Sequence, residues 1–214
     1  MNKKTLFRIF LIGAAVGLVG GLFGWLQFYG NAVRSEHELY VSRQADYASL
    51  TDSLMPVLRH RAAFRFYAKR LNLENTFKPG HYVLQRGMSV KDVVKMLKFG
   101  MQTPVRVTIN HVRTPAQLAG KLGRQLDADS AAWLRALTDK ELASDVGFDS
   151  LTLFSMFIPD TYEFYWTVKP DAFVQRMRRE YDRFWTAERD SLRSRSKLSR
   201  LEVMTLASIV YEET

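Results

Sequence analysis

The sequence contains no cysteine, and this absence excludes disulfide bonds and thiolate chemistry. Metal-ligand spacing is absent as well, because the four histidines are scattered and each is expected at the surface or in a turn. They are His37, His60, His81 and His111. No G-x-S-x-G elbow, phosphate-binding loop or dinucleotide fingerprint occurs. We therefore expect neither a metal nor a cofactor.

An uncharged run of 18 residues lies near the N-terminus, from Ile9 to Leu26. Its length suits a transmembrane helix, because the hydrocarbon core of a bilayer needs roughly 20 apolar residues. The alternative is a cleaved signal peptide, but the run is longer than a signal core and no small-x-small cleavage pattern follows it. We predict a cytoplasmic tail over 1–8 and a transmembrane anchor over 9–29.

The flanks of this run predict its orientation. Positive charges precede it, at Lys3, Lys4 and Arg8. Such charges favour the cytoplasmic side of a membrane, so we predict a single-pass protein of the cell (inner) membrane with its body outside the cytoplasm. Aromatic residues lie at the far end of the run, as they do at an outer membrane interface: Trp25, Phe28 and Tyr29.

Glycines recur at every fourth position within this run. One series is Gly13, Gly17 and Gly21, and a second pair is Gly20 and Gly24. Small residues at this spacing let two helix backbones approach closely. Glycine is also common in membrane helices generally, so a helix-pairing motif and ordinary composition both stay open.

The formal net charge is +9, and three of these positive charges precede the anchor, which leaves +6 for the rest of the chain. Lysine and arginine are spread along that part rather than clustered. Such a balance favours anionic partners, namely phospholipid head groups, an anionic polymer or nucleic acid. The predicted external location argues against nucleic acid.

Residues 30–36 are expected to form a linker, and residues 37–110 a small α+β module. Alternation of polar and apolar residues and turn signals predict its strands, at 37–42, 81–85 and 104–109. Helical spacing predicts its helices, at 46–58, 61–71 and 90–99. Ser89 caps the last of these helices, and Gly100 ends it.

From residue 111 onward the chain is predicted to be essentially helical. The expected helices are 115–126, 130–137, 139–146, 170–188 and a final helix that begins with a capping box at Ser199 and Glu202. Residues 193–200 are expected to form a basic loop. The helix over 170–188 has a predicted buried stripe, formed by Phe173, Met177, Tyr181 and Phe184. The whole chain is therefore assigned to the α+β class.

Two adjacent glutamates, Glu212 and Glu213, end the final helix. Leu206, Ile209 and Glu213 share one helical stripe, because their spacing is i, i+3 and i+7. Partial desolvation at the rim of an apolar face can raise the pKa of a carboxyl group, which can then act as a general acid. Position alone favours the alternative, in which both are ordinary glutamates at a helix end.

Residues 155–166 form an aromatic-rich segment with Asp160, Thr161, Tyr162 and Glu163 at its centre. Aromatic rings stack on sugars, and nearby Asp, Glu and Thr side chains bind sugar hydroxyls, so these four residues are candidate substrate ligands. The alternative is a hydrophobic turn packed into the core, in which Asp160 bonds its own backbone.

Several stretches resemble, in chain order, the YceG-like (MltG) endolytic murein transglycosylases. Lys-Pro-Gly-His-Tyr at 78–82, Leu-Lys-Phe-Gly at 97–100 and the strand at 102–109 resemble the N-terminal module of that family. Phe-Ile-Pro-Asp-Thr-Tyr-Glu-Phe at 157–164 resembles its Phe-Pro-Asp-Thr-Tyr segment. Leu-Ala-Ser-Ile-Val-Tyr-Glu-Glu-Thr at 206–214 resembles its active-site helix.

The resemblance implies that Glu213, directly before Thr214, is the catalytic glutamate. Tyr211 replaces a glutamate that many family members carry, and Glu212 replaces a basic residue, so Glu212 is the alternative catalytic residue. Members of the family continue well past this helix. We therefore expect the 214-residue chain to be an N-terminal portion that is incomplete and inactive by itself.

The implied domains are a LysM-like module over 37–110 and the first part of the catalytic domain over 111–214. The implied reaction cleaves peptidoglycan between N-acetylmuramic acid and N-acetylglucosamine without water and leaves 1,6-anhydro ends. Glu213 acts as acid and then as base, which favours a pKa near neutrality. An apolar pocket at the Ile209 and Val210 face is expected to supply that pKa.

The expected partners are nascent glycan strands near the membrane and the cell-wall synthases that make them, so the enzyme would terminate strand elongation. A second hypothesis is a non-catalytic, membrane-tethered glycan-binding or scaffold protein of the envelope. A third is a hydrolase that uses water, with Glu213 and Glu163 as its pair of carboxylates.

Overall fold

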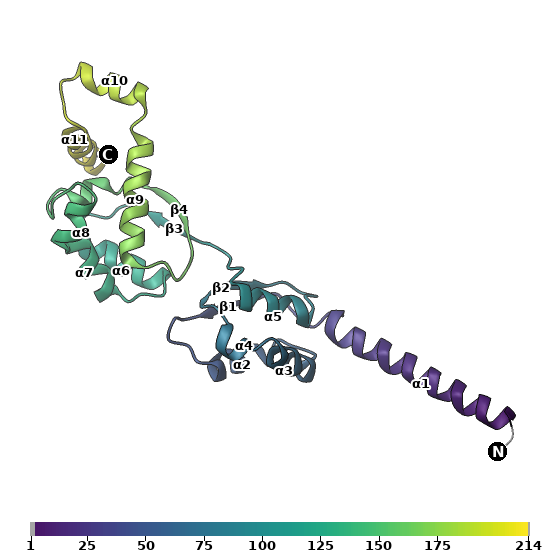
Figure 1. The fold of residues 1–214 in the computed structure, drawn as a ribbon. Coiled ribbons are helices and arrows are strands. Elements are labelled where there is room, and N and C mark those ends of the chain that lie inside the picture. The colour runs from purple at the N-terminus through teal and green to yellow at the C-terminus, as the bar shows by residue number, and fades with distance from the viewer. Residues whose placement is uncertain (1–2, 214) are drawn as a thin grey trace. The chain divides into compact units, whose positions relative to one another are not determined.

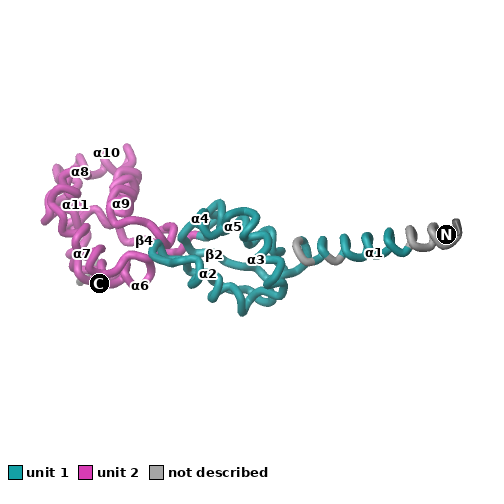
Figure 2. Tube along the Cα trace, turned by 60° about the horizontal axis from the view of Figure 1, so that its bottom comes forward, with its two compact units in different colours: residues 1–103 teal, residues 104–214 magenta. Residues whose placement is uncertain are grey.

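The computed structural model describes the backbone of residues 3–213 and the side chains of residues 12–22, 24–26 and 29–210. The chain divides into two compact units, residues 1–103 and 104–214 (Figure 2). Each unit has its own hydrophobic core. Helices and short strands occur in both units, so the α+β class predicted from the sequence is confirmed.

The first unit begins with α1, a helix of 27 residues from Lys3 to Tyr29 (Figure 1). At 1.5 Å per residue it is about 40 Å long. Its described large side chains, such as Val16, Leu18 and Leu22, are apolar and exposed. Among the residues that the structure describes, no helix combines the length and apolarity that a membrane span requires. The membrane anchor over 9–29 stays a prediction.

The rest of the first unit packs four helices around an antiparallel pair of strands. The strands are β1 (His37–Val41) and β2 (Gly80–Leu84), with Leu39 opposite Tyr82. The helices are α2 (Tyr47–Leu54), α3 (Arg61–Arg70), α4 (Leu73–Thr76) and α5 (Val90–Phe99). Their buried side chains come from both strands and all four helices, so this unit holds a complete small core.

Helix α5 begins and ends where its sequence predicts. The Ser89 hydroxyl accepts a hydrogen bond from the Asp92 backbone N–H at 3.2 Å. At the other end Gly100 has a φ of 67°, in the left-handed region that favours glycine. The predicted apolar face of the helix is buried, and it consists of Val90, Val93, Val94 and Leu97.

The predicted helix over 46–58 is shorter than expected, because α2 ends at Leu54. Pro56 has no backbone N–H to donate within a helix. Leu58 instead forms an isolated antiparallel bridge with Val33. The short helix α4 was not predicted.

The second unit contains an antiparallel pair made by β3 (Val105–Ile109) and β4 (Asp160–Phe164). Two predictions are corrected by this pair. The strand expected at 104–109 exists, but it belongs to the second unit, so the first module ends at Thr103 rather than at residue 110. The part after residue 111 is also not purely helical, because it contains β4, which was not predicted.

The helices of the second unit mostly follow the predicted spans. They are α6 (Pro115–Gln125), α7 (Ser130–Thr138), α8 (Lys140–Asp145), the 3-10 helix η1 (Leu153–Met156), α9 (Pro170–Phe184), α10 (Ala187–Arg195) and α11 (Arg200–Glu213). The long helix predicted over 170–188 ends early, at Phe184. A new helix, α10, starts after Thr186, whose hydroxyl oxygen accepts a hydrogen bond from the Arg189 backbone N–H at 3.3 Å. Part of the predicted basic loop is therefore helical.

Phe173 of α9 lies at the centre of the second core. Its ring meets Trp133 edge to face, with centroids 5.2 Å apart, and Phe164 of β4 at 4.8 Å. Phe157 stacks on it at 6.1 Å. The aromatic-rich segment is thus held against α9 and α7 by ring contacts. Of the predicted α9 stripe, Phe184 alone is only half-buried.

Candidate functional site

The helix α11, which carries the two candidate catalytic glutamates, begins with the predicted capping box. The Ser199 backbone N–H donates to Glu202 Oε2 at 2.7 Å, and Glu202 N donates to Ser199 Oγ at 3.2 Å. The bond from the Ser199 backbone, followed by that with its side chain, lowers the pKa of Glu202. Glu202 therefore has a structural role at the helix start.

An ion-pair cluster connects α10 to the start of α11. The Asp190 carboxylate accepts hydrogen bonds from Arg193 Nε at 3.0 Å and from Arg200 Nε at 3.0 Å, and Arg200 Nη2 pairs with it as well. Arg200 also lies 5.4 Å from the centre of the Trp185 ring. The hydrogen bond from Arg200 is the main reason that the pKa of Asp190 falls to about 2. These contacts fix the start of α11 relative to α10.

From Thr205 to Val210, the described side chains of α11 are exposed. Val203 and Met204 pack against the core of the second unit, beside η1. Leu206 is 49% exposed, Ile209 55% and Val210 62%. The apolar pocket expected at the Ile209 and Val210 face is therefore not formed by the described residues. The stripe of Leu206 and Ile209 is present on the helix, and the pocket itself stays a prediction.

The backbone of α11 continues in helical form through Glu213, which keeps Glu213 at the spacing predicted from Leu206 and Ile209. The side chains of Glu213, the catalytic candidate, and of Glu212, its alternative, lie outside the described residues, as does Thr214. Their roles stay predictions.

Tyr162, a candidate substrate ligand, faces inward from β4. Its side chain is buried, and its phenol donates a hydrogen bond to the Ile158 carbonyl at 2.8 Å. Burial, aided by the negative charges of Asp160 and Glu180, raises the pKa of Tyr162 to about 12. This phenol already has a hydrogen-bond partner inside the protein, so Tyr162 belongs to the core and is not placed to contact a ligand.

Thr161 and Glu163 lie on the opposite face of the same strand. Thr161 pairs with Thr108 of β3, with their hydroxyl oxygens 2.8 Å apart, and Glu163 lies directly opposite Arg106. Arg106 and Glu163 are exposed, and Thr161 and Thr108 are half-buried. We name these four residues, with Tyr165, the outer ribbon face. It presents two hydroxyls, a carboxylate and a guanidinium side by side.

Tyr165 follows β4 directly and is 57% exposed. It continues the alternation of Thr161 and Glu163, so its ring is available to a ligand on the outer ribbon face. Sequence reasoning missed both Tyr165 and Arg106. Alternation along 160–165 was the available signal, but it needed the strand to be recognised first.

Asp160 is exposed at the start of β4, and its carboxylate accepts the Thr161 backbone N–H at 2.6 Å. This bond is the one expected of the alternative in which the segment is a packed turn. The segment thus combines both hypotheses: Phe157, Tyr162 and Phe164 are core, whereas the outer residues face solvent.

No group of three or more potential metal ligands occurs among the residues that the structure describes. A hollow of the second unit lies at α6, and none of the predicted site residues lines it.

Comparison with known proteins relates the chain to a family. A family model described as the YceG-like family matches residues 39–214. No curated protein matches the chain at a significant level. Among solved structures, the chain is similar to a yceG-like protein from Listeria monocytogenes, with 20% sequence identity and a TM-score of 0.48 over 84% of this chain. The chain spans 65% of the length of that protein.

The fold and the site define an α+β protein of two compact units whose last helix ends in paired glutamates. Because the family model covers most of the sequence, the chain belongs to the YceG-like family.

Proposed function

We propose that this protein is a membrane-anchored endolytic transglycosylase of peptidoglycan that cuts nascent glycan strands and so ends their elongation. The observation that carries the proposal is the family match over residues 39–214, since the YceG-like family is generally linked to lytic transglycosylases. The match includes the helix that ends in Glu212 and Glu213, where the resemblance places the acid.

The proposed chemistry needs one carboxyl group. Glu213 as an acid protonates the glycosidic oxygen, and the bond from that oxygen to C1 of N-acetylmuramic acid breaks. The C6 hydroxyl of the same sugar then bonds to C1 and gives its proton to the Glu213 carboxylate. The products are an N-acetylglucosamine end and a 1,6-anhydro end, and Glu213 is protonated again. No water is consumed, in contrast to glycosidases that use two carboxylates.

The outer ribbon face is the proposed contact with the glycan. Its Tyr165 ring offers an apolar surface to a sugar, and the Thr161 and Thr108 hydroxyls can exchange hydrogen bonds with sugar hydroxyls. Glu163 and Arg106 add a charged acceptor and donor beside them.

Helix α1 is the proposed anchor. Its described apolar side chains are exposed along the helix, from Ile12 to Leu26, and a bilayer would cover them. The positive residues before them, Lys3, Lys4 and Arg8, support a cytoplasmic N-terminus. We propose that this places the enzyme beside the synthases that extend the strand.

A second candidate is a non-catalytic glycan-binding or scaffold protein tethered to the envelope. The outer ribbon face favours it, since the exposed Tyr165 ring and the paired Thr108 and Thr161 hydroxyls could bind a glycan without any catalytic group. Its prediction is that Glu213→Gln leaves glycan binding and cellular role intact and that no strand is cut.

Mass spectrometry of purified glycan strands distinguishes the candidates. The longest available form of the protein is incubated with strands, alongside its Glu213→Gln variant and the matched neighbour variant Glu212→Gln. We expect 1,6-anhydro ends from the parent and from Glu212→Gln, and none from Glu213→Gln. Activity that survives in Glu213→Gln but not in Glu212→Gln would move the role to Glu212. No cleavage by any folded form would favour the tethered binding protein.

A further inference from the structure

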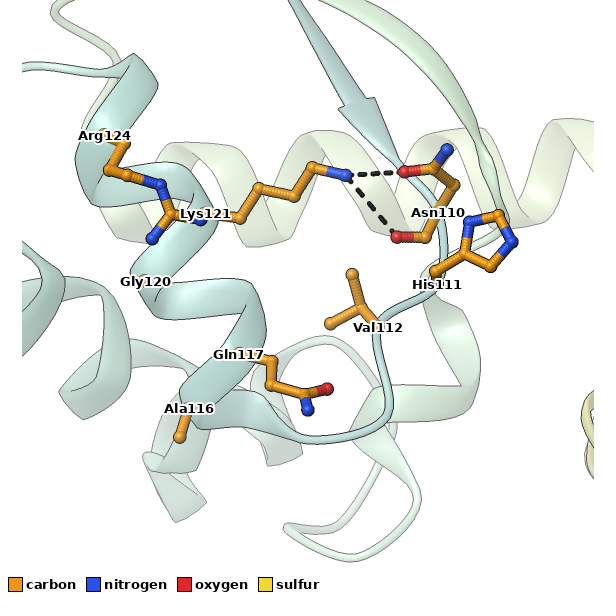
Figure 3. Close-up of a pocket in the computed structure, with 8 residues that line it drawn as sticks. All are labelled: Asn110, His111, Val112, Ala116, Gln117, Gly120, Lys121 and Arg124. Atoms are coloured by element: carbon orange, nitrogen blue, oxygen red, sulfur yellow. Dashed lines mark hydrogen bonds between the residues drawn. The ribbon is translucent and has the colours of Figure 1, made fainter. Parts of the chain in front are cut away.

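A hollow of about 490 Å³ lies between α6 and the loop that follows β3 (Figure 3). The loop contributes Asn110 and His111, and the helix contributes Gln117, Gly120, Lys121 and Arg124. Its volume is in the range of sites that hold organic ligands rather than single ions. It is open to solvent, so an attached group on a large polymer could enter it.

The hollow is built by hydrogen bonds that join the loop to the helix at two points. Lys121 Nζ donates to Asn110 Oδ1 at 2.6 Å and reaches the Asn110 carbonyl at 3.4 Å. One helical turn earlier, Gln117 Oε1 accepts the Arg113 backbone N–H at 2.9 Å. Between these bonds His111 adopts a left-handed backbone, with a φ of 49°. The loop is therefore held away from the helix rather than collapsed onto it.

The charges around the hollow are of one sign. Its charged lining residues, Lys121 and Arg124, are cations, and no carboxylate is found among the described residues that line it. The Arg124 guanidinium is exposed and has no hydrogen-bond or ion-pair partner among the described residues. A guanidinium matches a carboxylate with two parallel hydrogen bonds, and Lys121 adds charge beside it.

Gly120 keeps the centre of the hollow empty. It lies one turn from both Gln117 and Arg124 on the helix surface that faces the loop. A Cβ atom at this position would meet only Arg124 Nη1, at 3.7 Å, so the missing side chain leaves open space. Any larger residue would project into the cavity.

We propose that this hollow binds a carboxylate of the peptide stems that branch from the glycan strand. The inference rests on the proposed function, because the peptide stems of such a strand carry carboxylates. The cations of the hollow would bind the carboxylate. The side-chain amides of Asn110 and Gln117 would bind the peptide backbone. It would make the protein prefer strands that still bear their stems over strands whose peptides have been removed.

The test compares two ligands, glycan strands with intact stems and the same strands after an amidase has removed the stems. The amidase leaves a lactyl carboxylate on each muramic acid, held close to the sugar ring, so the comparison separates a carboxylate of the stem from a carboxylate of the glycan itself. Binding is measured at equilibrium with the full chain in detergent, in a Glu213→Gln background so that no strand is consumed. Arg124→Gln removes the unpaired guanidinium. Gly120→Leu fills the hollow with a residue that favours helix more than glycine does, so loss of folding does not explain its effect. Arg135→Gln, an exposed arginine on α7, is the matched control.

The parent is expected to bind stem-bearing strands about tenfold more tightly than stem-free strands, the ratio typical of one charge-assisted hydrogen-bonded contact. Arg124→Gln and Gly120→Leu should lower the first affinity to the level of the second and leave the second unchanged. Arg135→Gln should change neither.

Equal binding of both ligands by the parent would overturn the inference, as would an equal loss on both ligands in Arg124→Gln. The proposed function would still stand if the parent released anhydro ends from either ligand. Binding to neither ligand, together with no cleavage, would remove the inference and the proposed function alike.

Discussion

Residues 160–165 lie in one short segment, yet their surroundings give them different roles. Tyr162 is bonded inside the core to the Ile158 carbonyl, whereas Tyr165, three positions later, is 57% exposed. Side-chain alternation along a strand separates them, because neighbouring residues point to opposite faces. Two tyrosines that look equivalent in sequence are therefore expected to respond differently to substitution.

Tyr162→Phe is expected to destabilise the second unit by about 1 kcal/mol, because the Ile158 carbonyl loses its hydrogen-bond donor in a buried place. Glycan binding should be unchanged, since the phenol faces the core. Thermal unfolding and glycan affinity of the purified variant provide the measurement. Loss of affinity at unchanged stability would contradict the inward assignment.

Tyr165→Ala is expected to weaken glycan binding about fivefold to tenfold, because an aromatic contact contributes about 1 kcal/mol beyond its burial. Tyr165→Phe is the matched control, since it keeps the ring and should bind as the parent does. Affinity for isolated strands is the readout. If both variants bind like the parent, the outer ribbon face is not the glycan contact.

The lowered pKa of Asp190 predicts how the stability of the start of α11 changes in acid. Its folded-state pKa, about 2, lies below the ordinary value of 3.8, so the contribution of its carboxylate to stability is present above pH 3.8 and is lost as the pH falls toward 2. Asp190→Asn should remove this dependence and loosen α11 at neutral pH. Tryptophan fluorescence is a suitable readout, because Arg200 lies 5.4 Å from the Trp185 ring. Identical acid titrations of parent and variant would show that the ion pairs do not hold the helix.

At the scale of elements, those with local signals could be predicted. Helix α5 has its cap at Ser89 and its end at Gly100, and α11 has its capping box, so a few neighbouring residues specify each boundary. The strand β4 gave no such signal. Its five residues follow Pro159 in an aromatic cluster, and their partner β3 is distant in the sequence. Only the packing of Phe164 on Phe173 and the pairing with β3 make that segment a strand.

Gly100→Ala is expected to destabilise the first unit by about 1–2 kcal/mol, because an L-residue is strained at its φ of 67°. Its Cβ would also lie 3.2 Å from the Lys78 side chain. Gly120→Ala is the matched control of opposite sign: it has open space in a helix and should stabilise the second unit by up to about 1 kcal/mol. Chemical denaturation of the full chain measures both. The same sign for the two variants would contradict this account.

At the scale of the whole molecule, two compact parts after the first helix could be predicted from the sequence, but the residue at which one ends and the next begins could not. A small α+β module and a more helical second part are both present, but the boundary lies at Thr103 because β3 pairs with β4. Of the candidate site, the helical stripe on α11 could be predicted from spacing, and its catalytic chemistry stays a prediction. The exposure of Leu206, Ile209 and Val210 depends on what covers α11, and no spacing within the helix can specify that.

The central claim is that the protein cuts glycan strands without water. Incubation of strands with the protein in ¹⁸O-labelled water, followed by mass spectrometry of the new ends, tests this most directly. A transglycosylase yields anhydro ends that lack one water relative to a hydrolysed end and carry no ¹⁸O. New reducing ends labelled with ¹⁸O would contradict the claim and identify a hydrolase, for which Glu213 and Glu163 would be the first pair of carboxylates to substitute.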